Sequence, residues 1–167
     1  MAGGGESATS DAFEWNGFTF NNTKSINTAR FYGAVGSQGT VNSHLFMGGR
    51  TPTYLANTEE YSCSTALEFG AWSADANMNT ARTSHAGAGI AEAALTFGGN
   101  TTGTQTLGYD GTSWSTRPSL STGRTYFAGF GTNTAALAAA NNPAATTVEE
   151  YTGAETTAVN VKTLTQS

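Results

Sequence analysis

The tetrapeptide Asn-Thr-Ala-Arg occurs twice in the chain, ending at Arg30 and at Arg82, and a looser copy, Ser-Thr-Gly-Arg, ends at Arg124. A chain that repeats one unit in this way folds as an array of equivalent supersecondary structures, because each copy buries its apolar face against its neighbours. The arginines are 52 and 42 residues apart, close to the periods of about 40 to 50 residues that mark propellers and solenoids. The recurrence therefore predicts a repeat fold, although no single residue has yet indicated a catalytic or binding function.

The stretches that follow the three arginines share one order of segments. A segment rich in glycine and alanine comes first, then a second apolar segment that ends in Gly-Gly in the first two units and in Asn141-Asn142 in the third. A loop rich in Gly, Thr and Asn leads to an aromatic segment centred on Trp15, Tyr61, Tyr109 and Tyr151. A second aromatic follows five residues later at Phe20 and Trp114, eleven residues later at Trp72, and is replaced by Thr156 in the last unit.

Four short segments per period, each bounded by glycine or by an Asn-Gly or Asp-Gly pair, predict a four-stranded antiparallel blade in each unit. The abundance of Gly, Thr, Ser and Asn disfavours helix. The two most helix-like segments, residues 90–95 and 133–140, occupy the second-strand position of their units. We therefore expect strands there. Aromatic residues alternate over residues 13–20 around an Asn-Gly pair, which predicts two strands joined by a turn.

The motif order resembles the kelch repeat of β-propellers: a double glycine, an acidic-aromatic strand, a tryptophan about five residues on, and an arginine after a short polar run. The run from Tyr109 to Trp114 (YDGTSW), with the Asn-Thr-Ala-Arg tetrad, is similar to kelch-like repeats in virion and tail-fibre proteins of tailed bacteriophages. The ending over residues 161–167 is similar to the ends of such chains. The resemblance covers residues 13–167 and implies an all-β domain. Residues 1–12 are small and polar, which predicts a flexible or partner-ordered arm.

The number of units does not close a ring. Full units span residues 31–82, 83–124 and 125–166, and half a unit of two strands precedes Arg30. The third unit lacks the double glycine, and the final strand lacks both Trp and Arg, with Gln166 at the arginine position. Propellers carry about 4 to 8 blades, and an open arc of three and a half would expose strand edges. We expect an obligate assembly, completed by other copies of the chain or by docking onto a larger scaffold.

The balance of charge excludes several partners. Only 11% of the residues are charged, against roughly 25% in an average soluble domain. The net charge is -5 and the basic residues are scattered, so we expect no nucleic-acid partner. No apolar run approaches the roughly 20 residues that span a bilayer, and residues 1–11 lack the features of a signal peptide. Cys63 is the only cysteine, which excludes an internal disulfide.

Arg30, Arg82 and Arg124 are three of only seven basic residues. They could form a ring of ligand-binding cations, or each guanidinium could use its five donors to tie carbonyls and an acidic residue of the neighbouring blade together. We favour the structural role because the arginine recurs in every unit. The glutamate pairs Glu59-Glu60 and Glu149-Glu150 occupy one repeat position, so we also expect a structural role for them rather than the acid-base pair of a hydrolase.

The recurring aromatic residues allow two interpretations. Taken singly, they look like sugar-stacking rings; taken at their period, they form the core between neighbouring sheets. We favour the core for the following set: Trp15, Phe20, Tyr61, Trp72, Tyr109, Trp114 and Tyr151. Recognition is expected on the variable connections, residues 50–57 and 63–68, because insertions sit on loops and loops carry binding functions. Within the first of these, the candidate recognition residues are Arg50, Thr53, Tyr54 and Asn57.

No catalytic, cofactor or metal site is predicted. His44 and His85 are the only histidines, lie in different strands of successive units, and have no third ligand at a spacing suited to zinc. Cys63 has no histidine or aspartate near it in sequence to make it a nucleophile. A copper oxidase of the kelch type, which would combine tyrosines, two histidines and a cysteine, is the enzymatic alternative. We expect both histidines to be packed strand residues.

These observations predict a non-enzymatic structural component of a phage-like virion, either a fibre or an outer decoration protein, acting in host attachment or in capsid or tail assembly. Its expected location is the virion, and its expected partners are other copies of itself and other virion proteins, with a host surface glycan as a further candidate. The alternative is an extracellular carbohydrate-binding adhesion module. A third hypothesis, a propeller enzyme, would require a bound metal.

Overall fold

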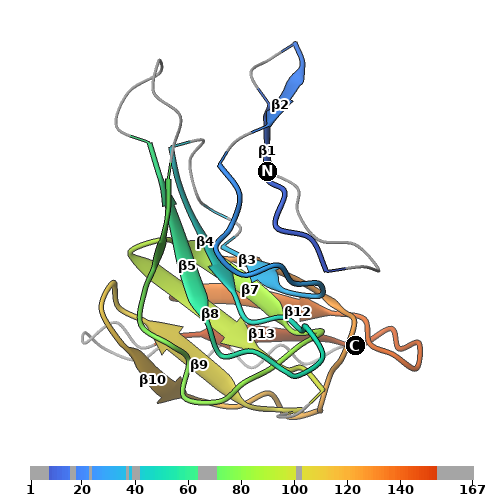
Figure 1. The fold of residues 1–167 in the computed structure, drawn as a ribbon. Helices are drawn as coiled ribbons and strands as arrows, with labels where there is room; N and C mark the ends of the chain where they lie inside the picture. Colours follow the sequence, from blue (N-terminus) through green and yellow to red (C-terminus); the bar gives the residue numbers. More distant parts are fainter. Residues whose placement is uncertain are drawn as a thin grey trace.

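The computed structural model describes residues 8–15, 18–22, 24–36, 38, 42–63, 71–100 and 103–153. All regular secondary structure in these residues is β-structure, and none of them lies in a helix (Figure 1). The strands form antiparallel sheets in which neighbours in sequence are neighbours in space. The expectation of an all-β fold is confirmed.

Three sheets correspond to the three full units. Sheet I contains β3 (Ala34–Val35), β4 (Ser43–Met47), β5 (Thr58–Ser62) and β6 (Ala71–Ala74). Sheet II contains β7 (Ala86–Ile90), β8 (Ala93–Phe97), β9 (Thr106–Tyr109) and β10 (Trp114–Arg117). Sheet III contains β11 (Ala128–Gly131), β12 (Ala135–Ala139) and β13 (Val148–Thr152) within the described residues.

The two helix-like segments form strands, as their position in the repeat predicts. β8 pairs with β7 and β9, and β12 pairs with β11 and β13, so each is held from both sides. Paired neighbours fix a pleated backbone despite the high intrinsic helix propensity of alanine. The second segment ends earlier than expected. Ala140 and Asn141, and not Asn141 and Asn142, stand where the other units have Gly-Gly, because Ala140 shares the left-handed backbone of Gly48 and Gly98.

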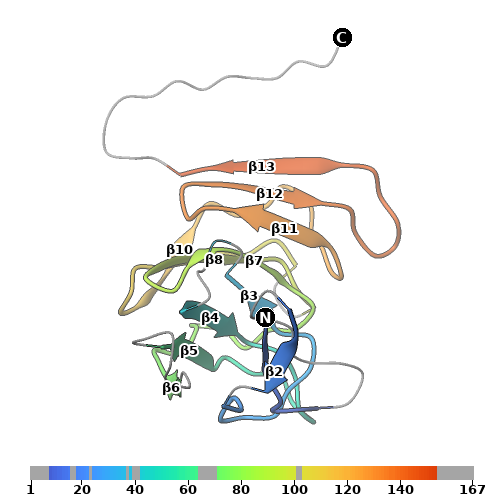
Figure 2. The same cartoon turned by 90° about the horizontal axis from the view of Figure 1, so that it is seen from above.

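The three sheets lie face to face in chain order, with sheet II between the other two (Figure 2). Their first strands, β3, β7 and β11, lie side by side at the centre, and β7 contacts both of the others. Each sheet therefore meets the next through its first strand and one broad face. This arrangement is propeller-like.

Three apolar clusters fill the spaces between these layers. Sheets I and II enclose Ala34, Leu45, Met47, Met78, Ala91, Ala94, Leu107, Tyr109 and Trp114. Sheets II and III enclose Ala86, Ala88, Leu95, Phe97, Ala136 and Ala138. The third cluster lies between sheet I and the N-terminal segment and contains Ala12, Ile26, Phe46, Tyr61 and Trp72.

Within the described residues, sheet III differs from sheet II in that only one of its faces is covered. Most residues of β7, β8 and β9 are buried, whereas β11 and β13 alternate between exposed and half-buried residues. Strand alternation and the pairing register place one set of side chains on the uncovered side. We call this set the outer face of sheet III: Ala128, Phe130, Ala135, Leu137, Ala139, Val148, Glu150 and Thr152. Phe130 is 51% exposed and Val148 57% exposed.

The half unit before Arg30 forms the predicted pair of strands, β1 (Phe13–Trp15) and β2 (Phe20–Asn22), which rises above the stacked sheets in Figure 1. Trp15 pairs with Phe20 in the same register that joins Tyr109 to Trp114. The pair thus matches the third and fourth strands of a full unit. Phe20 is expected in the core but is 62% exposed, because in the described part of the chain β1 and β2 form a sheet of their own that belongs to none of the three larger sheets.

The folded part of the chain begins before residue 13. The carbonyl of Thr9 accepts a hydrogen bond from the amide of Arg30 (3.1 Å), and that of Ser10 accepts one from Ile26 (2.9 Å). Ala12 is 3% exposed and belongs to the third apolar cluster. Of the predicted arm over residues 1–12, the last four residues therefore pack against their own chain, and residues 1–7 lie outside the described part.

Candidate functional site

Arg30 joins the N-terminal half unit to sheet I. Its side chain is fully buried, and its guanidinium donates to the carbonyls of Thr28 (3.1 Å), Gly48 (3.0 Å) and Asn57 (3.1 Å) and forms an ion pair with Glu59. The Glu59 carboxylate also accepts a hydrogen bond from the amide of Asn27 (2.6 Å). Four of the five guanidinium N–H donors are thus used within the protein, and the fully buried side chain is not open to a ligand from solvent.

Arg124 repeats this arrangement between sheets II and III. Its guanidinium lies 3.0 Å from the Glu149 carboxylate and donates to the carbonyls of Ala140 (2.6 Å) and Thr147 (3.0 Å). Burial acts to raise the pKa of Glu149, but hydrogen bonds from Ser121, Arg124 and Thr122 outweigh it and lower that pKa. Glu59 and Glu149 are therefore junction residues, and strand alternation turns the second glutamate of each pair to the other face of its sheet.

Arg82, at the junction of sheets I and II, has no carboxylate partner in the described part of the chain. Leu107 stands at the position of Glu59 and Glu149. The Arg82 guanidinium instead donates to the Gln105 side-chain oxygen (2.6 Å) and to the carbonyls of Gln105 (3.2 Å) and Gly98 (3.4 Å). Burial lowers the pKa of Arg82 to about 10. Burial, followed by the nearby Arg82 charge, lowers the pKa of His85 to about 3, so His85 is neutral at physiological pH.

The recurring rings of the first two units are core residues. Tyr61 and Tyr109 are 0% and 2% exposed, and each packs against the tryptophan of the following strand. The ring centroids are 5.4 Å apart for Tyr61 and Trp72 and 5.0 Å apart for Tyr109 and Trp114. The side chain of Trp15 lies outside the described part. None of the four buried rings presents a face to a sugar.

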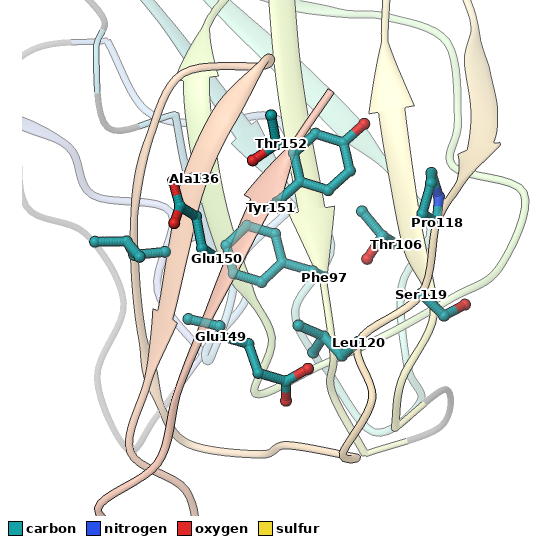
Figure 3. Close-up of a pocket in the computed structure, with 12 residues that line it drawn as sticks. Phe97, Thr106, Pro118, Ser119, Leu120, Ala136, Glu149, Glu150, Tyr151 and Thr152 are labelled. Atoms are coloured by element: carbon teal, nitrogen blue, oxygen red, sulfur yellow. The ribbon is translucent and has the colours of Figure 1, made fainter. Parts of the chain in front are cut away.

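Tyr151, the equivalent ring of sheet III, is only half-buried and lines a cavity of about 200 Å³. The cavity lies between sheets II and III, and Figure 3 shows Phe97, Leu120 and Tyr151 around it. We call it the ring cavity, with the following lining: Phe97, Thr106, Pro118, Ser119, Leu120, Ala136, Leu137, Ala138, Glu149, Glu150, Tyr151 and Thr152. Three of these, Leu137, Glu150 and Thr152, also belong to the outer face of sheet III, so the cavity reaches the outer side of β12 and β13. A single planar group could enter between the two sheets.

The ring cavity occupies the place that Trp114 fills at the preceding junction. Trp114 packs in the cluster that contains Met78, and its Nε1 donates to the carbonyl of Ala76 (3.0 Å). Pro118 and Leu120 stand at the same distances before Arg124 as Ala76 and Met78 before Arg82, and both line the cavity. The loss of the aromatic at Thr156 was visible in the sequence, but the cavity itself required the structure.

The candidate recognition loop, residues 50–57, is a tightly bonded turn. The Arg50 guanidinium lies over the rings of Phe31 (6.0 Å) and Tyr54 (5.7 Å), and Tyr54 is 40% exposed. Thr53 is exposed and its carbonyl accepts from Thr51 (3.0 Å). Asn57 is set apart, because its carbonyl holds Arg30. The structure thus brings Arg50 and Tyr54 together at the surface. The second loop falls mostly on residues outside the described part.

A pair of tyrosines that sequence reasoning missed lies where the first strands meet. Tyr32, Ser84 and Tyr126 each follow an arginine by two residues and have positive φ angles of 56°, 55° and 50°. The Ser84 amide donates to the Tyr32 carbonyl and the Tyr126 amide to the Ser84 carbonyl, both at 3.1 Å. The two tyrosine rings meet edge to face at 5.6 Å. They are 40% and 51% exposed. Their constant offset from the arginines was the available signal.

The residues considered for metal or redox chemistry lie apart. His44 lies in β4 beside the Tyr61 ring, His85 is buried just before β7, and Cys63 is half-buried after β5. In the described ranges, no three His, Cys, Asp or Glu side chains are grouped to hold a metal ion. Nor does that part of the chain contain a helix long and apolar enough to cross a membrane.

Sequence comparison finds no protein-family model and no curated protein that matches the chain. Solved structures do resemble it, among them one described as "Structure of YjhT", with a TM-score of 0.60 and 13% identity. The match covers 73% of this chain and 42% of that one, so the chain spans less than half the length of this neighbour. At this identity the likeness concerns the fold alone.

Proposed function

We propose that the chain is a structural subunit of a phage-like virion, a fibre or outer decoration protein, in which an open kelch-like arc of blades is completed by another polypeptide. One observation carries the assembly role: no described residue covers the outer face of sheet III, and this face is largely apolar. It presents Phe130, Leu137 and Val148 with several alanines, and only one of its side chains is charged.

Sheet II shows what such a face looks like when it is covered, because its strands are buried between two neighbours. The opposite end of the stack is closed by the chain itself, since Ala12 and Ile26 pack on sheet I. Exposed apolar patches rimmed by polar residues mark interaction surfaces. An additional sheet, from a second copy or from a neighbouring virion protein, would pack on the outer face of sheet III and extend the stack.

The sequence motifs of the repeats and the amino-acid composition support a location in a virion. The YDGTSW run and the Asn-Thr-Ala-Arg tetrads are similar to kelch-like repeats of phage virion and tail-fibre proteins, and charged residues make up only 11% of the chain. A surface whose polarity comes from hydroxyl and amide groups suits a particle-bound subunit. Host attachment or capsid and tail assembly is the role that follows.

Purified particles test this function. We expect the chain in them at a copy number that fits a symmetric assembly, and its complete absence would refute the virion role. Phe130→Glu should weaken self-association or incorporation, because it places a charge in the outer face of sheet III. Thr116→Glu, at an exposed position of β10, is the matched control and should leave assembly intact.

The exposed rings favour a second candidate, a carbohydrate-binding adhesion module. Tyr32 and Tyr126 present an edge-to-face pair, and Tyr54 stands exposed beside Arg50. Aromatic faces with a polar group at the edge are suited to stack on sugars. Glycan-array binding that is lost in Tyr54→Ala or Tyr126→Ala, while assembly is retained, would favour this function over a purely structural one.

A further inference from the structure

We infer that the ring cavity is the receptor for a tryptophan side chain, carried by an extended segment of a partner chain that pairs with β13 as the fourth strand of sheet III. The inference rests on the assembly role proposed above and names the chemistry of the partner. Among the described residues, nothing pairs with the outer edge of β13. A peptide strand could therefore form backbone hydrogen bonds there while its side chain fills the cavity.

Sheet II shows the arrangement in its complete form. β10 runs antiparallel to β9 and places Trp114 opposite Tyr109, with the ring centroids 5.0 Å apart. Tyr151 holds the position of Tyr109 in sheet III, and Pro118 holds that of Ala76, whose carbonyl accepts the Trp114 Nε1 hydrogen bond. An indole opposite Tyr151 would thus find both a ring to pack on and a carbonyl to accept its N–H group.

The shape and lining of the cavity fit one side chain. Its volume of about 200 Å³ lies below the roughly 300 to 1,000 Å³ of clefts that hold drug-sized ligands. Phe97, Ala136 and Ala138 form an apolar floor within the second cluster, and Leu120 packs against it. Thr106 and Ser119 add polar groups to the lining. A flat ring with a single N–H donor matches this combination.

Residues 154–167, which follow β13 in sequence, do not carry such a ring. Thr156 stands five residues after Tyr151, the interval that separates Trp114 from Tyr109, and residues 154–167 contain no Phe, Trp or Tyr. Residues 154–167 therefore do not supply the ring, and we assign it to the partner strand. A partner strand would both pair with the edge of β13 and fill the cavity, whereas a free aromatic compound would fill only the cavity.

The test uses the full chain and a labelled peptide with the sequence of residues 111–118 (GTSWSTRP), which contains the strand that fills this place in sheet II. Binding is measured by calorimetry and by sedimentation. We expect saturable binding that weakens by about tenfold or more in the W114A version of the peptide, as expected when burial of a large ring is lost. If a second copy already supplies the strand, the peptide should dissociate the assembly, with the same dependence on tryptophan.

A matched pair of protein variants locates the site. Ser119→Trp places a ring at the cavity from an exposed position and should abolish peptide binding. Asn77→Trp introduces the same ring at the equivalent exposed position of the filled junction, five residues before Arg82, and should bind the peptide as the wild type does. Thermal melts of both variants establish that they are folded.

Three results would overturn the inference: no binding of the tryptophan peptide, equal binding of both peptides, or full binding by Ser119→Trp. Binding of free indole as tight as that of the peptide would also overturn it and identify a small-molecule site. Failure of the peptide with a preserved symmetric assembly would remove this site but leave the proposed function standing. A monomeric chain that binds the peptide would support this site but contradict the proposed assembly.

Discussion

Each buried arginine stabilises its junction between units because carbonyl and side-chain oxygens accept hydrogen bonds from its guanidinium. Arg30 and Arg124 have a glutamate, whereas Arg82 has the Gln105 side chain in its place. An uncompensated buried charge is costly, which explains why two different solutions occur at one repeat position. The residues at positions 57 and 59, 105 and 107, and 147 and 149 therefore act as linked pairs.

This linkage predicts a specific rescue. Glu59→Leu should lower the free energy of unfolding by about 3 kcal/mol, because it leaves Arg30 buried without a carboxylate. Adding Asn57→Gln copies the Gln105 and Leu107 arrangement around Arg82 and should recover a measurable part of that loss. Urea unfolding of the single and double variants checks this, and a double variant no more stable than the single one would contradict it.

His85 should make stability depend on pH. Its folded pKa of about 3 lies below its ordinary value of 6.5, so between these values the unfolded chain binds a proton that the folded chain does not. Stability is complete above about pH 6.5 and falls as the pH is lowered, by up to about 1.4 kcal/mol per pH unit. Urea unfolding of His85→Gln should show a shallower slope from pH 6.5 to 4 and run parallel to the wild type above pH 7. An unchanged slope would refute the assignment.

The structural role of the arginines could be predicted from recurrence alone, because a residue that recurs in every unit of an array holds neighbouring units together. The partners could be predicted only in part. Glutamate at positions 59 and 149 was visible, but the role of Gln105 depends on a side chain that reaches Arg82 from one position before the strand. Tyr32 and Tyr126 escaped prediction because their pairing arises from the meeting of distant units.

At the scale of elements, the end of the second strand in each unit requires a left-handed residue. Gly48 and Gly98 meet this need with φ angles of 57° and 70°, and Ala140 meets it at 67° with a side chain that disfavours it. A Cβ on Gly98 would lie 2.6 Å from the Phe127 ring. The repeat therefore tolerates alanine only where the neighbouring unit leaves room.

Exchanging these residues should change stability in opposite directions. Ala140→Gly should raise the free energy of unfolding by about 0.5 kcal/mol or more, because it relieves the left-handed strain by more than the added flexibility costs. Gly98→Ala should lower it by at least about 2 kcal/mol through strain and overlap with Phe127. Thermal and urea unfolding measure both, and a stable Gly98→Ala protein would contradict this account of the strand end.

The strands themselves were predictable, since short segments bounded by glycine form a meander, and position in the repeat correctly overrode alanine's helix propensity at β8 and β12. Burial was not predictable for each strand. Phe20 carries the same pattern as Trp114 but is exposed, because the described residues place β1 and β2 in a two-stranded sheet and not in a full blade. A repeat pattern specifies which face is apolar, and the neighbours decide whether that face is covered.

At the scale of the whole molecule, the three stacked sheets end on two unlike surfaces. The N-terminal segment covers sheet I, whereas sheet III exposes the outer face defined above and leaves the ring cavity beside the edge of β13. The unit count predicted an incomplete arc from sequence. Which end of the described stack is covered could not be predicted, because it depends on Ala12 and Ile26 packing against sheet I.

The mass of the native protein in solution tests the central claim most directly. Native mass spectrometry, supported by sedimentation over a range of concentrations, should show a closed symmetric assembly of copies, and Phe130→Glu should shift it toward the single chain. A monomer at every concentration, unfolding in one cooperative transition, would contradict the claim that another chain completes the stack.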